Sequence, residues 1–175
     1  MGPALTDVRH NLLPHLLLLG LALCCLLASG TTAADLRGRV LHVYDGDTLL
    51  VDGVGKIRLV GIDAPESVAS ARDDYYQRWQ VSPEKLRRVA RQAKQFCIRQ
   101  TRSGEVTVVL AQNPRDRHGR RLAYVRLANG RLLNRLLLEQ GLAAVYRRFD
   151  FRMKKDFLAA EQKARLQNRG LWRKF

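Results

Sequence analysis

The chain has 175 residues, of which 31 are lysine or arginine and 16 are aspartate or glutamate, so its formal net charge at pH 7 is +15. This length is typical of about one domain, and no internal repeat, low-complexity tract or linker follows residue 35, which excludes a repeat array. The excess positive charge favours a polyanionic partner such as nucleic acid, with an anionic membrane surface as the alternative.

The first 34 residues differ from the rest of the chain. Arg9 and His10 precede a Leu-rich stretch whose uninterrupted apolar run, residues 16–28, has 13 residues, fewer than the ~20 that a membrane-spanning helix needs. Small residues follow, which is the pattern of a secretory signal peptide cleaved after Gly30 or after Ala34. We therefore expect a secreted or periplasmic protein with no stable membrane association after cleavage. An uncleaved signal anchor that tethers the protein to a membrane is the alternative.

The cysteines add little to the functional argument. Removal of residues 1–34 would leave 141 residues with 30 basic and 15 acidic side chains, and an unchanged net charge of +15. Cys97 would then be the single cysteine, so the mature monomer could form no internal disulfide. It lies on the apolar face of a predicted helix and is expected to be a small core residue. Bulky Leu23 before Cys24 and Cys25 argues against a lipoprotein signal.

The remaining chain predicts strands first and helices later. Alternating apolar and polar residues, with Asp-Gly pairs in two turns, predict five short strands at about 37–44, 47–52, 55–61, 105–111 and 121–127. Apolar residues at helical spacing predict three helices, which begin at Pro83, near residue 131 and near residue 153. Ser82 is the expected N-cap of the first, and residues 67–83 are predicted to form a long loop. This order indicates an α+β domain, whose strand edges a small closed barrel would hide.

Acidic side chains are found at turns beside these strands, in the stretches DGDT (45–48) and RLVGIDAPE (58–66). Asp47 and Asp63 each stand at a predicted strand end, with Asp47 opening the second strand and Asp63 closing the third. Since the ends of antiparallel neighbours meet, we expect the two carboxylates to lie close together. Two carboxylates with a loop carbonyl and waters suit calcium. The isolated His42 and His118 and the lone Cys97 offer no zinc site.

Three further side chains complete a hydrolytic site. Hydrolysis of a phosphodiester needs positive charge on the phosphoryl oxygens and a base to deprotonate the attacking water, and a hard cation can assist both. Glu66, beyond a Pro-stiffened turn, is the candidate general base, and Arg58 and Arg120 are candidate phosphate clamps. Taken singly, each residue also has a structural reading as a turn former, a surface carboxylate or a salt-bridged arginine. Together they predict a nuclease site.

In order and spacing, the stretches DGDT, IRLVGIDAPE, DRHGRRLAYV, LLLEQGLAAVYRR and the C-terminal GLW resemble the staphylococcal (thermonuclease) nuclease family over about residues 36–172. The resemblance implies a five-stranded OB-type β-barrel with three α-helices. It also implies a Ca²⁺-dependent endonuclease that cleaves DNA and RNA and leaves 3′-phosphate ends. We expect it to act as a monomer.

The resemblance also implies roles for single residues. It makes Asp47 and Asp63 the calcium carboxylates, and Ala64 a third ligand through its main-chain carbonyl. Glu66 matches the family's proposed general base, and Arg58 and Arg120 match the arginines that neutralise the pentacovalent transition state. A nucleic-acid-binding module on the same barrel, without catalysis, is the main alternative. It would be expected to lack some of these side chains.

The chain departs from the family pattern at two candidate substrate contacts. His118 stands where the reference enzyme has a tyrosine that touches the substrate. Tyr146 approximates a nucleotide-stacking tyrosine. In the 67–83 loop, Tyr75, Tyr76 and Trp79 are either stacking platforms for bases or residues that pack the loop onto the barrel.

Overall fold

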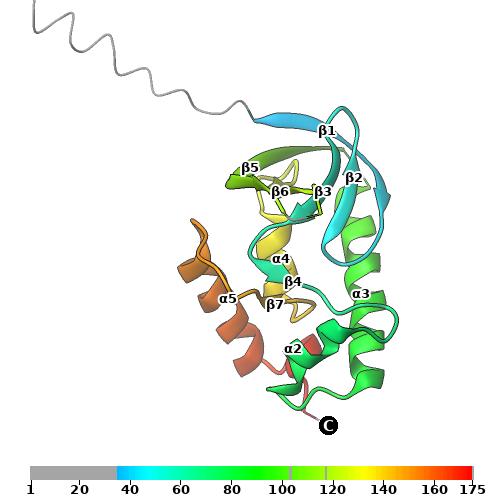
Figure 1. Cartoon of the computed structure of the whole chain (residues 1–175), viewed down its shortest axis with the longest axis vertical. Helices are drawn as coiled ribbons and strands as arrows, with labels where there is room; N and C mark the ends of the chain where they lie inside the picture. The colour runs from blue at the N-terminus through cyan, green and yellow to red at the C-terminus, as the bar shows by residue number, and fades with distance from the viewer. Residues whose placement is uncertain (1–34, 103, 117, 175) are drawn as a thin grey trace, which may run out of the picture. The chain divides into compact units, whose positions relative to one another are not determined.

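The computed structural model describes residues 35–102, 104–116 and 118–174 (Figure 1), so the predicted signal peptide lies outside the described residues. Five strands form a closed barrel in the order β1-β2-β3-β6-β5. These strands are β1 Leu36–Val43, β2 Thr48–Val51, β3 Gly55–Leu59, β5 Glu105–Arg115 and β6 Arg121–Arg126. The two remaining strands, β4 Ile62–Asp63 and β7 Ala144–Val145, pair with each other.

Closure of the barrel depends on one parallel pairing. β3 and β6 run parallel, whereas the pairs β1–β2, β2–β3, β5–β6 and β1–β5 are antiparallel. Because the sheet closes on itself, its main strands present no free edge to another chain. The α+β class and the five-stranded OB-type barrel predicted from the sequence are thereby confirmed.

The described residues contain four α-helices, α2 Asp74–Gln77, α3 Pro83–Thr101, α4 Leu133–Glu139 and α5 Lys154–Leu166, where three were predicted. The additional helix, α2, and the 3-10 helix η1 (Ala71–Asp73) lie in the segment predicted as a loop. Four residues are too few to produce a helical hydrophobic period, and so short a helix is unstable in isolation. Its order comes from tertiary packing, since Tyr76 is completely buried.

Helix α3 lies beside the barrel and packs against the turn before β2. As predicted, Ser82 is its N-cap, and the Ser82 Oγ accepts a hydrogen bond from the Lys85 amide at 3.4 Å. A Cβ added at Gly46 would lie 2.6 Å from the Cβ of Ala93 and 2.7 Å from that of Ala64. The turn that carries Asp47 can approach α3 this closely only because residue 46 is glycine.

The C-terminal helices are fixed by buried polar contacts and by one backbone contact. Asn134 of α4 is fully buried, accepts a hydrogen bond from the Val125 amide at 3.0 Å and donates one to the Val60 carbonyl at 3.0 Å. The Gly141 carbonyl accepts from the Leu171 amide at 2.8 Å. Helix α5 ends at Leu166, and Gly170 begins the 3-10 helix η2 (Gly170–Trp172) four residues later.

In the described part of the chain, no helix combines the length and apolar character needed to cross a membrane.

Candidate active site

Two carboxylates meet where β2 begins and β4 ends. Asp47 and Asp63 are each 2% exposed. The Ala64 amide donates to Oδ2 of Asp47 at 2.9 Å, and the Leu59 amide donates to the Asp47 carbonyl at 2.8 Å. The structure therefore brings together Asp47, Asp63 and Ala64, the three residues predicted as metal ligands.

Arg58 of β3 lies between these carboxylates. It pairs with Thr48 in the β2–β3 register, so its side chain begins next to Asp47. Its Nη1 donates to Oδ1 of Asp47, and its Nη2 donates to Oδ1 of Asp63 at 2.9 Å. With 11% of the side chain exposed, the guanidinium offsets the charge of two buried carboxylates. Removing it would leave both without a close cation on this side.

Arg72 enters the same cluster from η1 and was missed by the sequence analysis. Its Nη1 donates to Oε1 of Glu66 at 2.8 Å, and its Nη2 donates to Oδ1 of Asp63. The same Nη2 lies 3.9 Å from Oδ2 of Asp47. Arg72 thus contacts the candidate general base and both candidate metal carboxylates. No periodicity marks it, because it stands in an aperiodic stretch of a chain rich in arginine.

Negative charge accumulates around Glu66. Burial, and next the charges of Asp45 and Asp47, raise the pKa of the Glu66 carboxyl above its ordinary value. The charges of Arg58 and Arg120 act against this rise, so Arg120 lies within electrostatic reach of Glu66. Burial and then the charge of Asp47 also raise the pKa of the Asp45 carboxyl. Such a site favours the approach of a cation.

Tyr76 of α2 holds the second carboxylate in place. Its hydroxyl donates to the Asp63 carbonyl at 2.7 Å and lies 3.2 Å from Oδ2 of Asp63. Tyr75 is also buried, and its ring packs edge-on against Trp79 with centroids 5.4 Å apart. These aromatic side chains therefore pack the segment onto the protein, which was the predicted alternative to stacking platforms for bases.

Arg120 and His118 share the tight turn between β5 and β6. The Asp116 side chain organises this turn, since its Oδ1 accepts from the amides of His118 and Arg120, each at 2.9 Å. Nε of Arg120 donates to Oδ2 of Asp116 at 2.7 Å. His118 is exposed on the same turn.

Tyr146, the other candidate substrate contact, is half-buried next to β4. Its amide donates to the Gly61 carbonyl at 3.0 Å. Its ring packs against Tyr75 and Phe149, with centroids 5.9 and 5.3 Å away. The structure thus places Tyr146 beside the segment that leads into Asp63, with part of its side chain open to solvent.

The donor atoms fit a hard cation in type. Asp47 and Asp63 offer carboxylate oxygens and Ala64 a main-chain carbonyl, which is the chemistry that calcium prefers. Among the described residues, no group of three or more His, Cys, Asp or Glu side chains is arranged to hold a metal. A metal held by Asp47 and Asp63 would therefore need a carbonyl and waters as further ligands. In the structure, Arg58 and Arg72 hold the oxygens of the two carboxylates.

Comparison with known proteins agrees with this geometry. The profile of the family described as "Staphylococcal nuclease homologue" matches residues 56–174. The chain belongs to this family. Membership of the staphylococcal nuclease family makes the protein an enzyme of the nuclease class and confirms the resemblance seen in the sequence.

Three relatives illustrate the range of the family. A thermonuclease of Staphylococcus hyicus is 30% identical over 138 residues, which cover 77% of this chain and 74% of the relative. A protein of Escherichia coli named an uncharacterised endonuclease is 35% identical over 142 residues, covering 79% of this chain and 78% of the relative. An uncharacterised protein of Bacillus anthracis is 32% identical over 142 residues, covering 78% of this chain but 60% of the relative. The chain thus spans less than two thirds of the last protein.

Proposed function

We propose that this member of the staphylococcal nuclease family is a calcium-dependent endonuclease that hydrolyses DNA, RNA or both and leaves 3′-phosphate ends. The observation that carries the proposal is that two buried carboxylates, a third carboxylate and two arginines converge where β2, β3 and β4 meet. Family membership supports the coarser statement that the enzyme is a nuclease with a nucleic acid substrate.

Asp47 and Asp63 would hold the calcium ion, with the main-chain carbonyl of Ala64 as a further ligand. Bound calcium would supply a Lewis acid that offsets charge on the phosphoryl oxygens. Hydrogen bonds from the Ala64 amide and the Tyr76 hydroxyl orient the two carboxylates before any metal arrives. The two carboxylates would then need to move less when calcium binds.

Glu66 would accept the proton of the attacking water. Its side chain is 27% exposed, so water can reach it, whereas the metal carboxylates are enclosed. The raised pKa of Glu66, caused first by burial, makes the carboxylate a stronger base than an ordinary surface glutamate. Removal of this base would slow the chemical step while leaving the phosphate contacts in place.

Arg58 and Arg120 would bind the scissile phosphate from two sides. A guanidinium can donate two parallel hydrogen bonds to phosphate oxygens and keeps its charge at any working pH. Arg120 is held by Asp116 at the β5–β6 turn, and Arg58 by the strand register of β3. His118 on the same turn and Tyr146 beside β4 would contact flanking parts of the substrate.

The same chain supports two further proposals about its organisation. Residues 35–175 would form the nuclease domain, and residues 1–34 a signal peptide that directs secretion or periplasmic export. The match to the family profile over residues 56–174 supports the first, and the basic start, Leu-rich run and small residues of the N-terminal stretch support the second. We further propose that the mature enzyme acts as a monomer.

The binding-module alternative is disfavoured because the chain has all four side chains that such a module would be expected to lack in part: Arg58, Asp63, Glu66 and Arg120.

The first test incubates the purified protein with long single-stranded DNA, double-stranded DNA and RNA, in calcium, in magnesium and in chelator, and maps the fragment ends. Calcium-dependent internal cleavage that leaves 3′-phosphates is expected. Asp47→Ala should abolish cleavage in every metal, whereas Asp52→Ala, a matched change in an exposed hairpin turn, should not. Salt-sensitive binding without cleavage in any metal would refute the proposal in favour of a binding module.

A further inference from the structure

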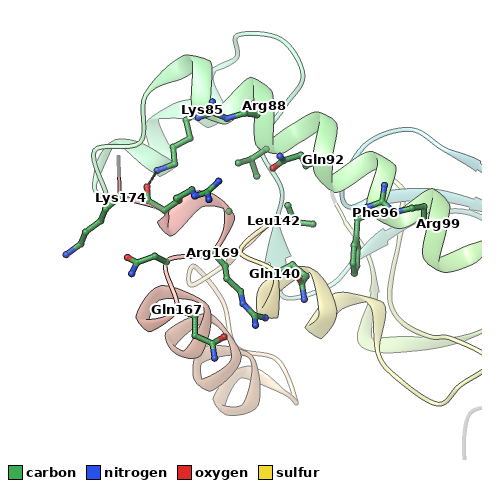
Figure 2. Close-up of a pocket in the computed structure, with 14 residues that line it drawn as sticks. Lys85, Arg88, Gln92, Phe96, Arg99, Gln140, Leu142, Gln167, Arg169 and Lys174 are labelled. Atoms are coloured by element: carbon green, nitrogen blue, oxygen red, sulfur yellow. Dashed lines mark hydrogen bonds between the residues drawn. The ribbon is translucent and has the colours of Figure 1, made fainter.

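A basic groove of about 970 Å³ lies between α3 and the C-terminal segment (Figure 2). Six cationic residues line it: Lys85, Arg88, Arg99, Arg169, Arg173 and Lys174. Among the described residues that form its lining, none is acidic. A surface of one sign, concentrated in a concave site, attracts and focuses a ligand of the opposite charge.

The groove also offers groups that recognise bases. Figure 2 shows Phe96 between Gln92 and Arg99 along α3, with Gln140 and Leu142 across the groove. Phe96 is half-buried, and its ring packs against the hydrophobic core while part of it faces the groove. A row of cations with an interleaved aromatic ring and side-chain amides is the combination that binds single-stranded nucleic acid, because bases stack on rings while phosphates pair with cations.

Hydrogen bonds hold the residues after α5 in place as one wall of the groove. Lys85 is only 7% exposed, and its Nζ donates to the Arg173 carbonyl, which ties α3 to the last residues of the chain. Nη1 of Arg169 donates to the Glu139 carbonyl at 3.1 Å, which joins the same wall to the end of α4. Burial, and then the charge of Arg88, lower the pKa of Lys85, so a phosphate in the groove would relieve an existing repulsion.

The groove lies on the same helix that supports the candidate active site. Ala93 packs against Gly46 in the turn that carries Asp47, and the Cys97 thiol donates to the Gly46 carbonyl at 3.5 Å. Successive residues of an α-helix are about 100° apart, so Gln92 and Phe96 project about a quarter of a turn or more from Ala93 and Cys97. A strand leaving the active site therefore has to pass around the flank of one helix, roughly 10–12 Å across, to reach the groove.

We propose that this groove is a second binding site for the substrate, which holds the sugar-phosphate backbone of a single strand outside the cleavage site. The inference rests on the proposed function, since it takes the strand to be that of a nuclease substrate. Its consequence is selectivity for length: a strand long enough to occupy both sites binds more tightly than a fragment that fills the active site alone.

The test replaces three cations of the groove together, in the variant Arg88→Gln, Arg99→Gln, Arg173→Gln. All three are exposed, and none makes an ion pair within the described residues, so the fold should be preserved. The matched control is Arg37→Gln, Arg126→Gln, Lys155→Gln, which removes the same charge from exposed positions outside the groove lining. Circular dichroism checks that both variants are folded.

Two measurements compare the variants in the full chain. The first is the Kd for a single-stranded DNA of about 16 nucleotides, in chelator, as a function of salt. At about 0.7 released counterions per phosphate contact, loss of three contacts should reduce the salt slope by about 2. The affinity advantage of wild type over the groove variant should then shrink roughly 16-fold between 50 and 200 mM salt. The second is cleavage of a dinucleotide with calcium, which should be unchanged in the groove variant.

Each other outcome has a distinct meaning. A groove variant that matches the control variant in Kd and salt slope overturns the inference. So does an equal loss of dinucleotide cleavage, because the cations would then act on the active site. In a third measurement, of binding to vesicles of anionic lipid, a loss in the groove variant with unchanged DNA binding would assign the groove to a membrane surface and also overturn the inference. If wild type cleaves nothing, the proposed function fails, while a DNA-binding defect confined to the groove variant would still support the groove.

Discussion

Replacement of Arg72 by glutamine is expected to tighten calcium binding. In the structure, the Arg72 guanidinium pairs with Glu66 at 2.8 Å and with Asp63, and lies 3.9 Å from Asp47. A calcium ion held by Asp47 and Asp63 would compete with this guanidinium for the same oxygens. Breaking the Arg72 pairs is therefore part of the free-energy cost of metal binding, and Arg72→Gln removes that part.

The size of the effect follows from the burial of the partners. Two unit charges about 4 Å apart interact with about 4 kcal/mol at an effective dielectric constant of 20, and fully exposed pairs contribute about 0–1 kcal/mol. The carboxylates are 2% exposed but the Arg72 side chain is 35% exposed, so the net cost lies between these limits. A value of about 1.5 kcal/mol corresponds to roughly tenfold tighter calcium binding in Arg72→Gln.

Isothermal titration of calcium into the protein, without nucleic acid, measures the calcium Kd of wild type and Arg72→Gln directly. The matched control is Arg131→Gln, which removes the same charge from a residue that pairs with Glu139 at 3.1 Å, outside the candidate site. Thermal melts should show that Arg72→Gln is less stable than wild type in chelator, because buried carboxylates lose a cation, and that calcium restores its stability. An unchanged or weaker calcium affinity in Arg72→Gln would refute the competition between guanidinium and metal.

Three further predictions concern the same site. Glu66→Gln should lower kcat by about 10²–10⁴-fold and leave the Kd for DNA nearly unchanged, and unchanged turnover would remove Glu66 from the role of base. Tyr76→Phe should cost about 1–2 kcal/mol of unfolding free energy in denaturant melts and weaken calcium binding, because the Asp63 carbonyl loses its 2.7 Å partner. Partial burial raises the pKa of Asp116, but hydrogen bonds from Arg120 and His118 outweigh it, and the net pKa lies below the ordinary value. The charged carboxylate therefore stabilises the fold at neutral pH. The Tm advantage of wild type over Asp116→Asn should be complete there and disappear only below about pH 4. An advantage that persisted in acid would show that the Asp116 charge does not hold the turn.

The barrel was predictable because its signals are local. Period-two alternation and Asp-Gly turns predict strands that agree with β1 to β3 within one or two residues, and Ser82 with Pro83 marks the start of α3 correctly. Strand order accounts for the meeting of Asp47 and Asp63 only in part, because β3 ends at Leu59 and Asp63 ends the separate strand β4, which pairs with β7. What could be predicted of the site was the part carried on regular strands and tight turns.

The remainder depends on contacts between segments distant in sequence. Nothing in the sequence distinguishes Arg72 from other arginines, because its position in the site is set by packing of the aperiodic segment. The groove combines α3 with residues that follow α4 and α5, and its cations come from two of these segments, α3 and the residues after α5, so no single run of basic residues reveals it. A helix pattern alone also does not show which cations of α3 face another segment and which face solvent.

Residues 67–83, predicted as a loop, contribute two side chains to the site, and both contact Asp63. Tyr76 donates a hydrogen bond to its carbonyl, and Arg72 pairs with its carboxylate. The segment is itself anchored at two points, by the Tyr75 hydroxyl on the Val145 carbonyl at 2.5 Å and by the ion pair between Asp73 and Arg87 of α3. Because Val145 lies on β7, the partner strand of β4, the same small sheet positions both Asp63 and the segment that neutralises it. A change that loosens this anchoring should therefore alter calcium affinity before it alters the barrel, since the metal carboxylate and its internal cation depend on the same contacts.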